Sequence, residues 1–178
     1  MKRLLFLTMY AVSLGAAAQL PDYVPADGLV AWYALDGDAF DKSGQGYDGQ
    51  IISAESQTNR FGMEEGALNF SSNSDEAVDL PDMPVFPNFS FSFWVRLNTI
   101  PNGVDSWIYG DWLHGGFGIV IDADANNQLY VHVDDIGLPT NDNGSCTSNY
   151  YFELGEWVHV VILRENGSVS FWVDGELY

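Results

Sequence analysis

Cysteine and basic residues are scarce in this sequence, and each shortage excludes a class of protein. Cys146 is the one cysteine among 178 residues, so the chain forms no internal disulfide; the thiol is either buried or paired outside the chain. Six lysines and arginines stand against 25 acidic residues, which gives a net charge of −19. Such a chain repels phosphate backbones and anionic lipids, so we expect neither a nucleic-acid nor a membrane partner.

Long apolar runs are also missing. Leu4–Leu14 is too short for a permanent membrane helix. Because Lys2 and Arg3 precede this run and Ala16-Ala17-Ala18 follow it, it predicts a secretory signal peptide over residues 1–18. We therefore expect a secreted protein, located outside the cell, on its surface or in a periplasm. After residue 19 no stretch has the apolar period of 3.6 that an amphipathic helix requires.

Motifs of common hydrolases are absent as well. The sequence contains no G-x-S-x-G, no phosphate-binding loop and no H-E-x-x-H. Its three histidines are isolated from one another, which disfavours a zinc site. We therefore expect no enzymatic activity.

Short strands are the main positive signal. In Phe89–Leu97 apolar residues alternate with Ser90, Ser92, Trp94 and Arg96, which is typical of a strand with one face in a core. Leu29–Leu35 is continuously apolar and predicts a strand buried on both faces. Further strands are expected at Ile51-Ile52, Ala67–Phe70, Ala77–Leu80, Ser106–Tyr109, Phe117–Ile121, Leu129–Val133, Tyr150–Leu154, Trp157–Arg164 and Val169–Val173.

Turn sequences separate these strands. Asn166-Gly167 and Asp174-Gly175 are strong hairpin signals, and Asp122–Asn127 reads as another hairpin loop rather than an EF-hand. About ten short strands predict an all-β fold, an antiparallel two-sheet jelly-roll sandwich. We expect a linker over residues 19–28 and one domain over residues 29–178. Because Glu176-Leu177-Tyr178 resembles the start of a strand, we expect that domain to lack its last strands and to belong to a longer parent chain with other domains.

Several segments resemble laminin-G-like domains of secreted bacterial proteins, which have the concanavalin A-like, pentraxin-like jelly roll. The resemblance rests on stretches spread over residues 28–175: Gly28–Gly37, Asp41–Gly49, Asn59–Gly62, Gly66–Phe70, Phe89–Val95, Gly155–Val161 and Phe171–Gly175. It implies a lectin-like or adhesion module that binds glycans or proteins and often carries Ca²⁺. Laminarinase-like enzymes of this fold carry E-x-D-x-(x)-E on one strand, and this triplet is absent here.

One acidic loop is a candidate calcium site. Asp36, Asp38, Asp41 and Asp48 place several carboxylates within a short glycine-rich stretch, and Ca²⁺ prefers such hard oxygen ligands. The alternative is that these carboxylates accept hydrogen bonds from nearby backbone N–H groups and shape the turn.

Ligand-binding residues are expected in the loops. We assign Trp94 and Trp172 to packing between strands, since most tryptophans on strands are structural. Two loop regions remain, because flat rings and polar groups in loops over a sheet are typical of binding sites. The candidate residues are Trp107, Tyr109, Trp112, His114, Asp134, Asp135 and Asn141.

The sequence thus predicts a non-catalytic secreted module that recognises carbohydrate or a cell-surface protein. Two alternatives stay open: a structural or adhesion spacer of a larger surface protein, and a remnant of a glycoside hydrolase.

Overall fold

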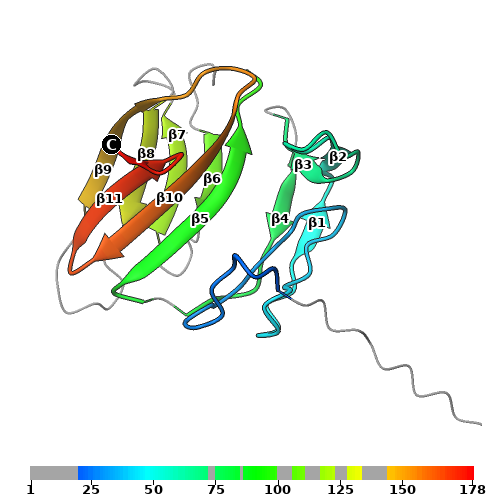
Figure 1. Ribbon diagram of the computed structural model, residues 1–178, viewed down its shortest axis with the longest axis horizontal. Helices are drawn as coiled ribbons and strands as arrows, with labels where there is room; N and C mark the ends of the chain where they lie inside the picture. Colours follow the sequence, from blue (N-terminus) through cyan, green and yellow to red (C-terminus); the bar gives the residue numbers. More distant parts are fainter. Residues whose placement is uncertain are drawn as a thin grey trace, which may run out of the picture. The chain divides into compact units, whose positions relative to one another are not determined.

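A computed structural model of the chain describes residues 20–71, 75–84, 86–99, 106–110, 117–122, 128–133 and 144–178. Within these ranges the chain forms strands and no helix, so none of them contains a helix able to cross a membrane. The chain divides into two compact units (Figure 1). We call them the N-terminal unit (Met1–Phe70 and Asp75–Pro81) and the C-terminal unit (Ser71–Ser74 and Asp82–Tyr178).

The C-terminal unit contains two four-stranded antiparallel sheets. The first sheet has the order β12-β11-β10-β5, and the second has the order β6-β7-β8-β9. The two sheets lie face to face in Figure 1, which confirms the predicted all-β antiparallel sandwich. Their strands are β5 (Phe89–Arg96), β6 (Ser106–Gly110), β7 (Phe117–Asp122), β8 (Gln128–Val133), β9 (Gly144–Tyr151), β10 (Trp157–Glu165), β11 (Ser168–Val173) and β12 (Glu176–Leu177).

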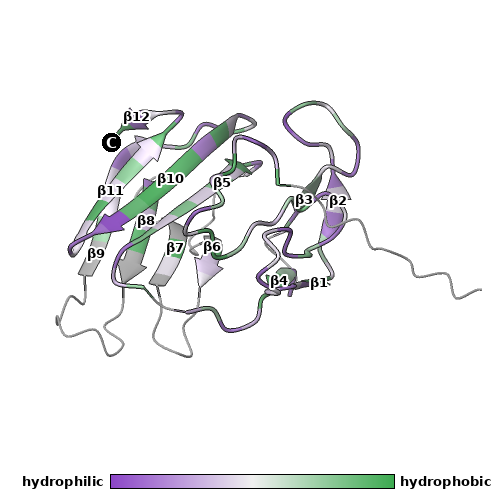
Figure 2. Cartoon of the chain, turned by 60° about the horizontal axis from the view of Figure 1, so that its bottom comes forward, coloured by the Kyte–Doolittle hydropathy of each residue, from purple (hydrophilic) through white to green (hydrophobic). Residues whose placement is uncertain are grey.

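The core lies between these sheets. Successive side chains of a strand point to opposite faces, so every second residue of β10 is buried, and Figure 2 colours most of this strand as hydrophobic. The fully or nearly buried side chains of the core are Ile119, Leu129, Val131, Phe152, Val158, Val160, Ile162, Phe171 and Val173. Burial of each stabilises the unit by about 1.5–3 kcal/mol. Phe91, Phe93 and Val95 of β5 pack against this core, as their alternation predicts.

Two tight turns connect the last three strands. Asn166 and Gly167 both have positive φ, 50° and 83°, and so do Asp174 and Gly175, 49° and 86°. Two central residues with positive φ define the turn whose twist matches that of paired strands. Both predicted hairpins are therefore confirmed, and the second leads into β12.

The prediction for the strand before β10 was wrong in its position. We expected Tyr150–Leu154, whereas β9 spans Gly144–Tyr151 and ends before the buried Phe152. The sequence of β9 is mostly polar and small, so no apolar alternation marks it. Its inward residue Ser148 is buried and satisfies its hydroxyl by bonding to Tyr150 of the same strand.

The N-terminal unit consists of two small antiparallel pairs joined by turns. The first pair is β1 (Gln50–Ile52) with β4 (Ala77–Asp79), and the second is β2 (Glu55–Gln57) with β3 (Ala67–Asn69). The sequence predicts β1, β3 and β4. The fully polar β2 carries no strand signal, and its three residues pair with β3 in an antiparallel ladder.

The predicted strand at Leu29–Leu35 was wrong. This segment is half-buried, and its pairing is one isolated bridge between Tyr33 and Asp41. The physical reason is that the following loop takes up its backbone groups. The N–H of Trp32 donates to the Asp41 carboxylate, and the Trp32 carbonyl accepts from the N–H of Lys42.

Candidate ligand-binding face

The first sheet has an outer face that points away from the core. Every second residue of β5, β10 and β11 lies on it, and the ladder places these residues directly opposite one another. We call this surface the outer face, and define it by Ser90, Ser92, Trp94, Arg96, Trp157, His159, Val161, Leu163, Glu165, Ser168, Ser170 and Trp172.

Two tryptophans of the outer face are accessible to solvent. Trp94 is 43% exposed and Trp172 is 37% exposed. We had assigned both to packing between strands. The structure instead places them on the face opposite the core, and Leu163, diagonal to Trp172 in the ladder, is also exposed. The alternation of β5 contained this information, because Trp94 is out of phase with the three core residues of that strand.

Trp94 belongs to a small organised cluster. Its ring stacks on the ring of His159, with centroids 5.1 Å apart and an interplanar angle of 23°. His159 Nε2 and Ser92 Oγ lie 2.8 Å apart in a hydrogen bond. The backbone of His159 is fixed as well, because its N–H donates to Asp174 Oδ1 and its carbonyl accepts from the N–H of Asp174. Trp94 is therefore held in one orientation by its neighbours.

Arg96 and Trp157 occupy one end of the outer face. The Arg96 guanidinium carbon lies 5.2 Å from the centre of a Trp157 ring, and Arg96 Nε donates to Asn98 Oδ1 at 3.1 Å. The indole N–H of Trp157 is buried and has no hydrogen-bond partner within the described part of the chain. Both side chains are half-buried.

The ladder also fixes the distance between the two exposed indoles. Trp94 pairs with His159, and Trp172 pairs with Val161, which is two residues further along β10. Two strand spacings and two residue steps place their Cα atoms roughly 12 Å apart on a diagonal of the sheet. A short oligosaccharide can span this distance.

Of the predicted ligand-binding residues, Tyr109 has a described side chain. It is half-buried in β6 and packs against the core, with its ring 5.0 Å from that of Phe91. The backbone of Trp107 lies in β6 opposite Val120, and its side chain is outside the description. The other five candidates lie outside the described residues: Trp112, His114, Asp134, Asp135 and Asn141. Ligand binding by these residues stays a prediction.

Asp41 organises the acidic loop of the N-terminal unit. Its Oδ1 accepts from the N–H groups of Trp32 and Ser43, and its Oδ2 accepts from those of Gly46 and Tyr47, at 2.9–3.1 Å. Burial alone would raise the pKa of Asp41, which is 8% exposed. The hydrogen bonds outweigh burial and lower this pKa from 3.8 to about 2.

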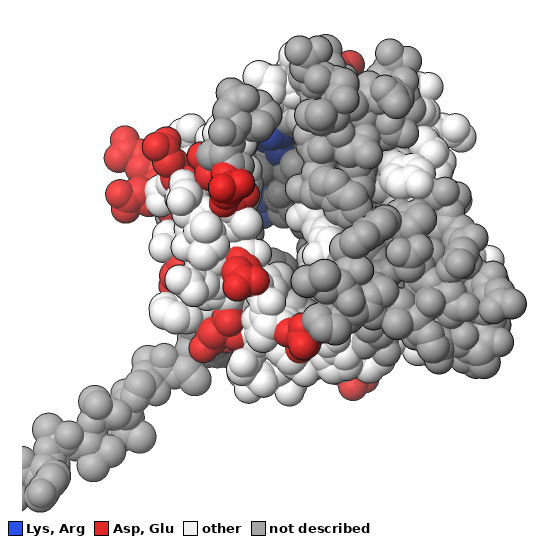
Figure 3. Space-filling view, turned by 180° about the vertical axis from the view of Figure 1, so that it is seen from behind, with Lys and Arg blue, Asp and Glu red and all other residues white. Residues whose placement is uncertain are grey.

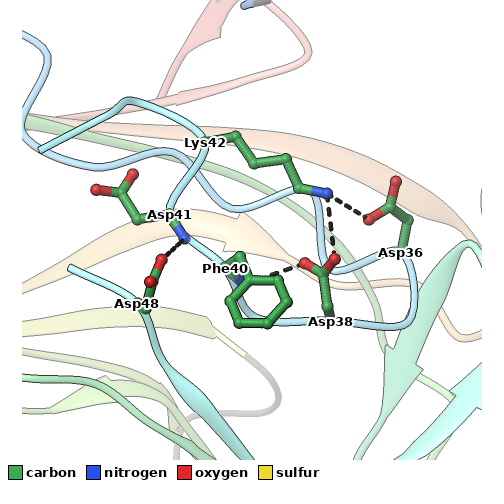
Figure 4. A network of polar contacts seen from close by, with 6 residues as sticks. All are labelled: Asp36, Asp38, Phe40, Asp41, Lys42 and Asp48. Carbon is green, nitrogen blue, oxygen red and sulfur yellow. Dashed lines mark hydrogen bonds and ion pairs between the residues drawn. The ribbon is translucent and has the colours of Figure 1, made fainter. Parts of the chain in front are cut away.

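The other three carboxylates of this loop also have protein partners. Lys42 Nζ lies 3.3 Å from both Asp36 and Asp38, and Asp48 accepts from the N–H of Asp41 (Figure 4). Burial lowers the pKa of Lys42, but the two carboxylates outweigh it and raise that pKa. Across the described residues, no group of three or more His, Cys, Asp or Glu could hold a metal ion. These contacts fit the turn-shaping alternative, and the calcium site stays a prediction.

Comparison with known proteins gives one family and one solved structure. The family model described as the concanavalin A-like lectin/glucanases superfamily matches residues 71–178, more than half of the chain. A crystal structure of an S-layer domain-containing protein (residues 221–444) from Clostridium thermocellum is also similar, with 22% sequence identity and a TM-score of 0.47. The match covers 83% of this chain and 70% of that one.

Proposed function

The chain belongs to the concanavalin A-like lectin/glucanases superfamily, and on that premise we propose that it is a secreted, non-catalytic module that binds carbohydrate on the outer face. One observation carries the proposal: Trp94 and Trp172 are both exposed on one face of a regular sheet, on the two strands that flank β10. A sugar ring has an apolar surface of C–H groups, and a flat indole ring offers a matching apolar surface. Removing both surfaces from water favours stacking.

Order at the binding surface supports the proposal. A side chain that is already fixed loses less conformational entropy when a ligand binds. Trp94 is held against His159, which in turn bonds to Ser92. The hydroxyl and imidazole of this cluster lie beside the indole, where they are placed to bond to sugar hydroxyl groups.

The composition of the outer face supports a non-catalytic role. Hydrolysis of a glycosidic bond requires a carboxylic acid and a second carboxylate on opposite sides of that bond. Glu165, at one end of β10, is the one carboxylate among the side chains that define the outer face, so this face lacks the second carboxylate. The face therefore offers stacking and hydrogen bonding, which suit recognition.

Affinity electrophoresis tests this function. Native gels cast with a broad panel of polysaccharides should retard the wild-type chain with at least one member. Trp94→Ala and Trp172→Ala should each weaken that binding by at least about tenfold, as expected for a central aromatic contact. Tyr151→Ala is the matched control, because Tyr151 is a 53% exposed ring on β9 of the other sheet.

Three results would contradict the proposal. A chain that no polysaccharide retards would instead favour an adhesion spacer or a protein partner. Loss of binding in Trp107→Ala or Trp112→Ala, with Trp94→Ala unaffected, would place the site at β6 or the segment after it, away from the outer face. Release of sugars from any bound polysaccharide would contradict the non-catalytic role.

A further inference from the structure

Basic side chains are almost absent around the outer face. Between residues 82 and 178 the sequence has two basic residues, Arg96 and Arg164, and thirteen acidic ones. Arg164 is 3% exposed, lies on the core side of β10 and donates to the Pro87 carbonyl. Arg96 is therefore the one basic residue of the C-terminal unit on the outer face.

Arg96 is already engaged. Its guanidinium group donates to Asn98 and lies over the ring of Trp157. The Nη groups of Arg96 are then the donors left to pair with a carboxylate or sulfate of a ligand. Arg96 also lies at one end of the face, since it pairs with Trp157, the first residue of β10.

Acidic side chains border the same sheet. Glu165 ends β10, and Asp174 and Glu176 lie in and after the turn between β11 and β12. All three are exposed. Figure 3 shows the molecule from behind, and among the residues coloured there acidic side chains outnumber basic ones. A chain with net charge −19 has a negative potential that opposes the approach of an anionic polymer.

We infer that the outer face binds an uncharged polysaccharide, lying in extended form across Trp172 and Trp94, and discriminates against anionic polysaccharides. The inference rests on the proposed function and adds the chemical class of its ligand. Stacking on the two indoles needs no charge on the sugar. The groups beside them, Ser92, Ser170 and His159, suit neutral hydroxyl groups. An anionic ligand would lose hydration near a negative surface on which Arg96, at one end, is the single basic group.

Matched pairs of polymers test the charge requirement. Hydroxyethyl cellulose and carboxymethyl cellulose share one backbone, and so do dextran and dextran sulfate, so each pair differs mainly in charge. We expect the full chain to bind the neutral member of at least one pair at least about tenfold more tightly at low salt, because like charges oppose association. Raising the salt from about 0.01 M to about 1 M should bring the affinities for the neutral and the anionic polymer closer together, since screening weakens the repulsion between like charges.

A charge-reversal variant ties the discrimination to this sheet. Glu165→Lys should reduce the preference for the neutral polymer over the anionic one without changing the affinity for the neutral polymer. The same charge reversal at Glu64, an exposed residue of the N-terminal unit, should leave this ratio of affinities unchanged. Equal or tighter binding of the charged polymer through Trp94 would overturn the inference and leave the proposed function intact. Absence of binding to every neutral and charged polymer would overturn both.

Discussion

Asp41→Asn is the substitution for which the structure gives the clearest magnitude. The carboxylate of Asp41 accepts four backbone hydrogen bonds, two on each oxygen. Asparagine keeps one oxygen, so its amide group would face two N–H donors that have lost their acceptor. The fall in pKa from 3.8 to about 2 corresponds to about 2 kcal/mol of stabilisation from the charged form at neutral pH.

Hydrogen exchange of the peptides that cover residues 30–49 measures this effect locally. We expect Asp41→Asn to lower the free energy of opening of this segment by about 2 kcal/mol at pH 7, or a roughly 30-fold faster exchange. Asp27→Asn is the control, because it removes the same charge from an exposed position of the same unit. The C-terminal unit supplies an internal reference, since its exchange should not change.

The pH dependence provides a second check. Because folding lowers the pKa of Asp41, its contribution is fully present well above pH 3.8 and is lost as the pH falls through about 2. After correction for intrinsic exchange rates, the difference between wild type and Asp41→Asn should shrink below pH 4 and fall to about 1 kcal/mol or less by pH 2.5. Equal protection of the two variants at pH 7, or a difference that persists at pH 2.5, would refute this account of the loop.

Two further predictions concern the core and the acidic loop. Phe171→Ala removes a 2% exposed ring between the sheets, so we expect the free energy of unfolding of the C-terminal unit, measured with urea, to fall by about 3–5 kcal/mol. A fall below about 1 kcal/mol would contradict the packing described for this ring. If Asp36, Asp38, Asp41 and Asp48 bind Ca²⁺, adding the ion to chelator-treated protein raises the melting temperature, because a ligand of the native state stabilises it by mass action. An unchanged melting temperature would leave these carboxylates with their turn-shaping role alone.

The sequence predicts the strands whose two faces differ. In β5 and β10 apolar residues alternate with others, and in the hairpin at Asn166-Gly167 the turn residues have positive φ. The sequence does not predict β2 or the polar start of β9, because their residues show no alternation of apolar and polar side chains. The prediction is also wrong at Leu29–Leu35. There the Asp41 carboxylate accepts a hydrogen bond from the N–H of Trp32, nine residues earlier, and the apolar pattern gives no sign of this contact.

The sequence likewise predicts only part of the candidate site. Alternation in β5 separates Trp94 from the core residues, but it does not say whether another layer covers that face. Assigning Trp94 and Trp172 to packing followed from the general behaviour of tryptophan on strands. The stack with His159 and the hydrogen bond to Ser92 join residues that are far apart in the sequence, so spacing along the chain gave no sign of them.

The pairing of β5 with β10 has a consequence for how the protein folds. β10 and β11 are neighbours in sequence and can form a hairpin within microseconds, whereas Ser92 and His159 are 67 residues apart. During synthesis at about 5–20 residues per second, β10 is therefore made several seconds after β5, and until then β5 lacks the strand with which it pairs. An alternating aromatic strand without its partner is prone to pair with other chains. Folding yield of this domain should therefore depend on whether β5 is shielded until β10 arrives.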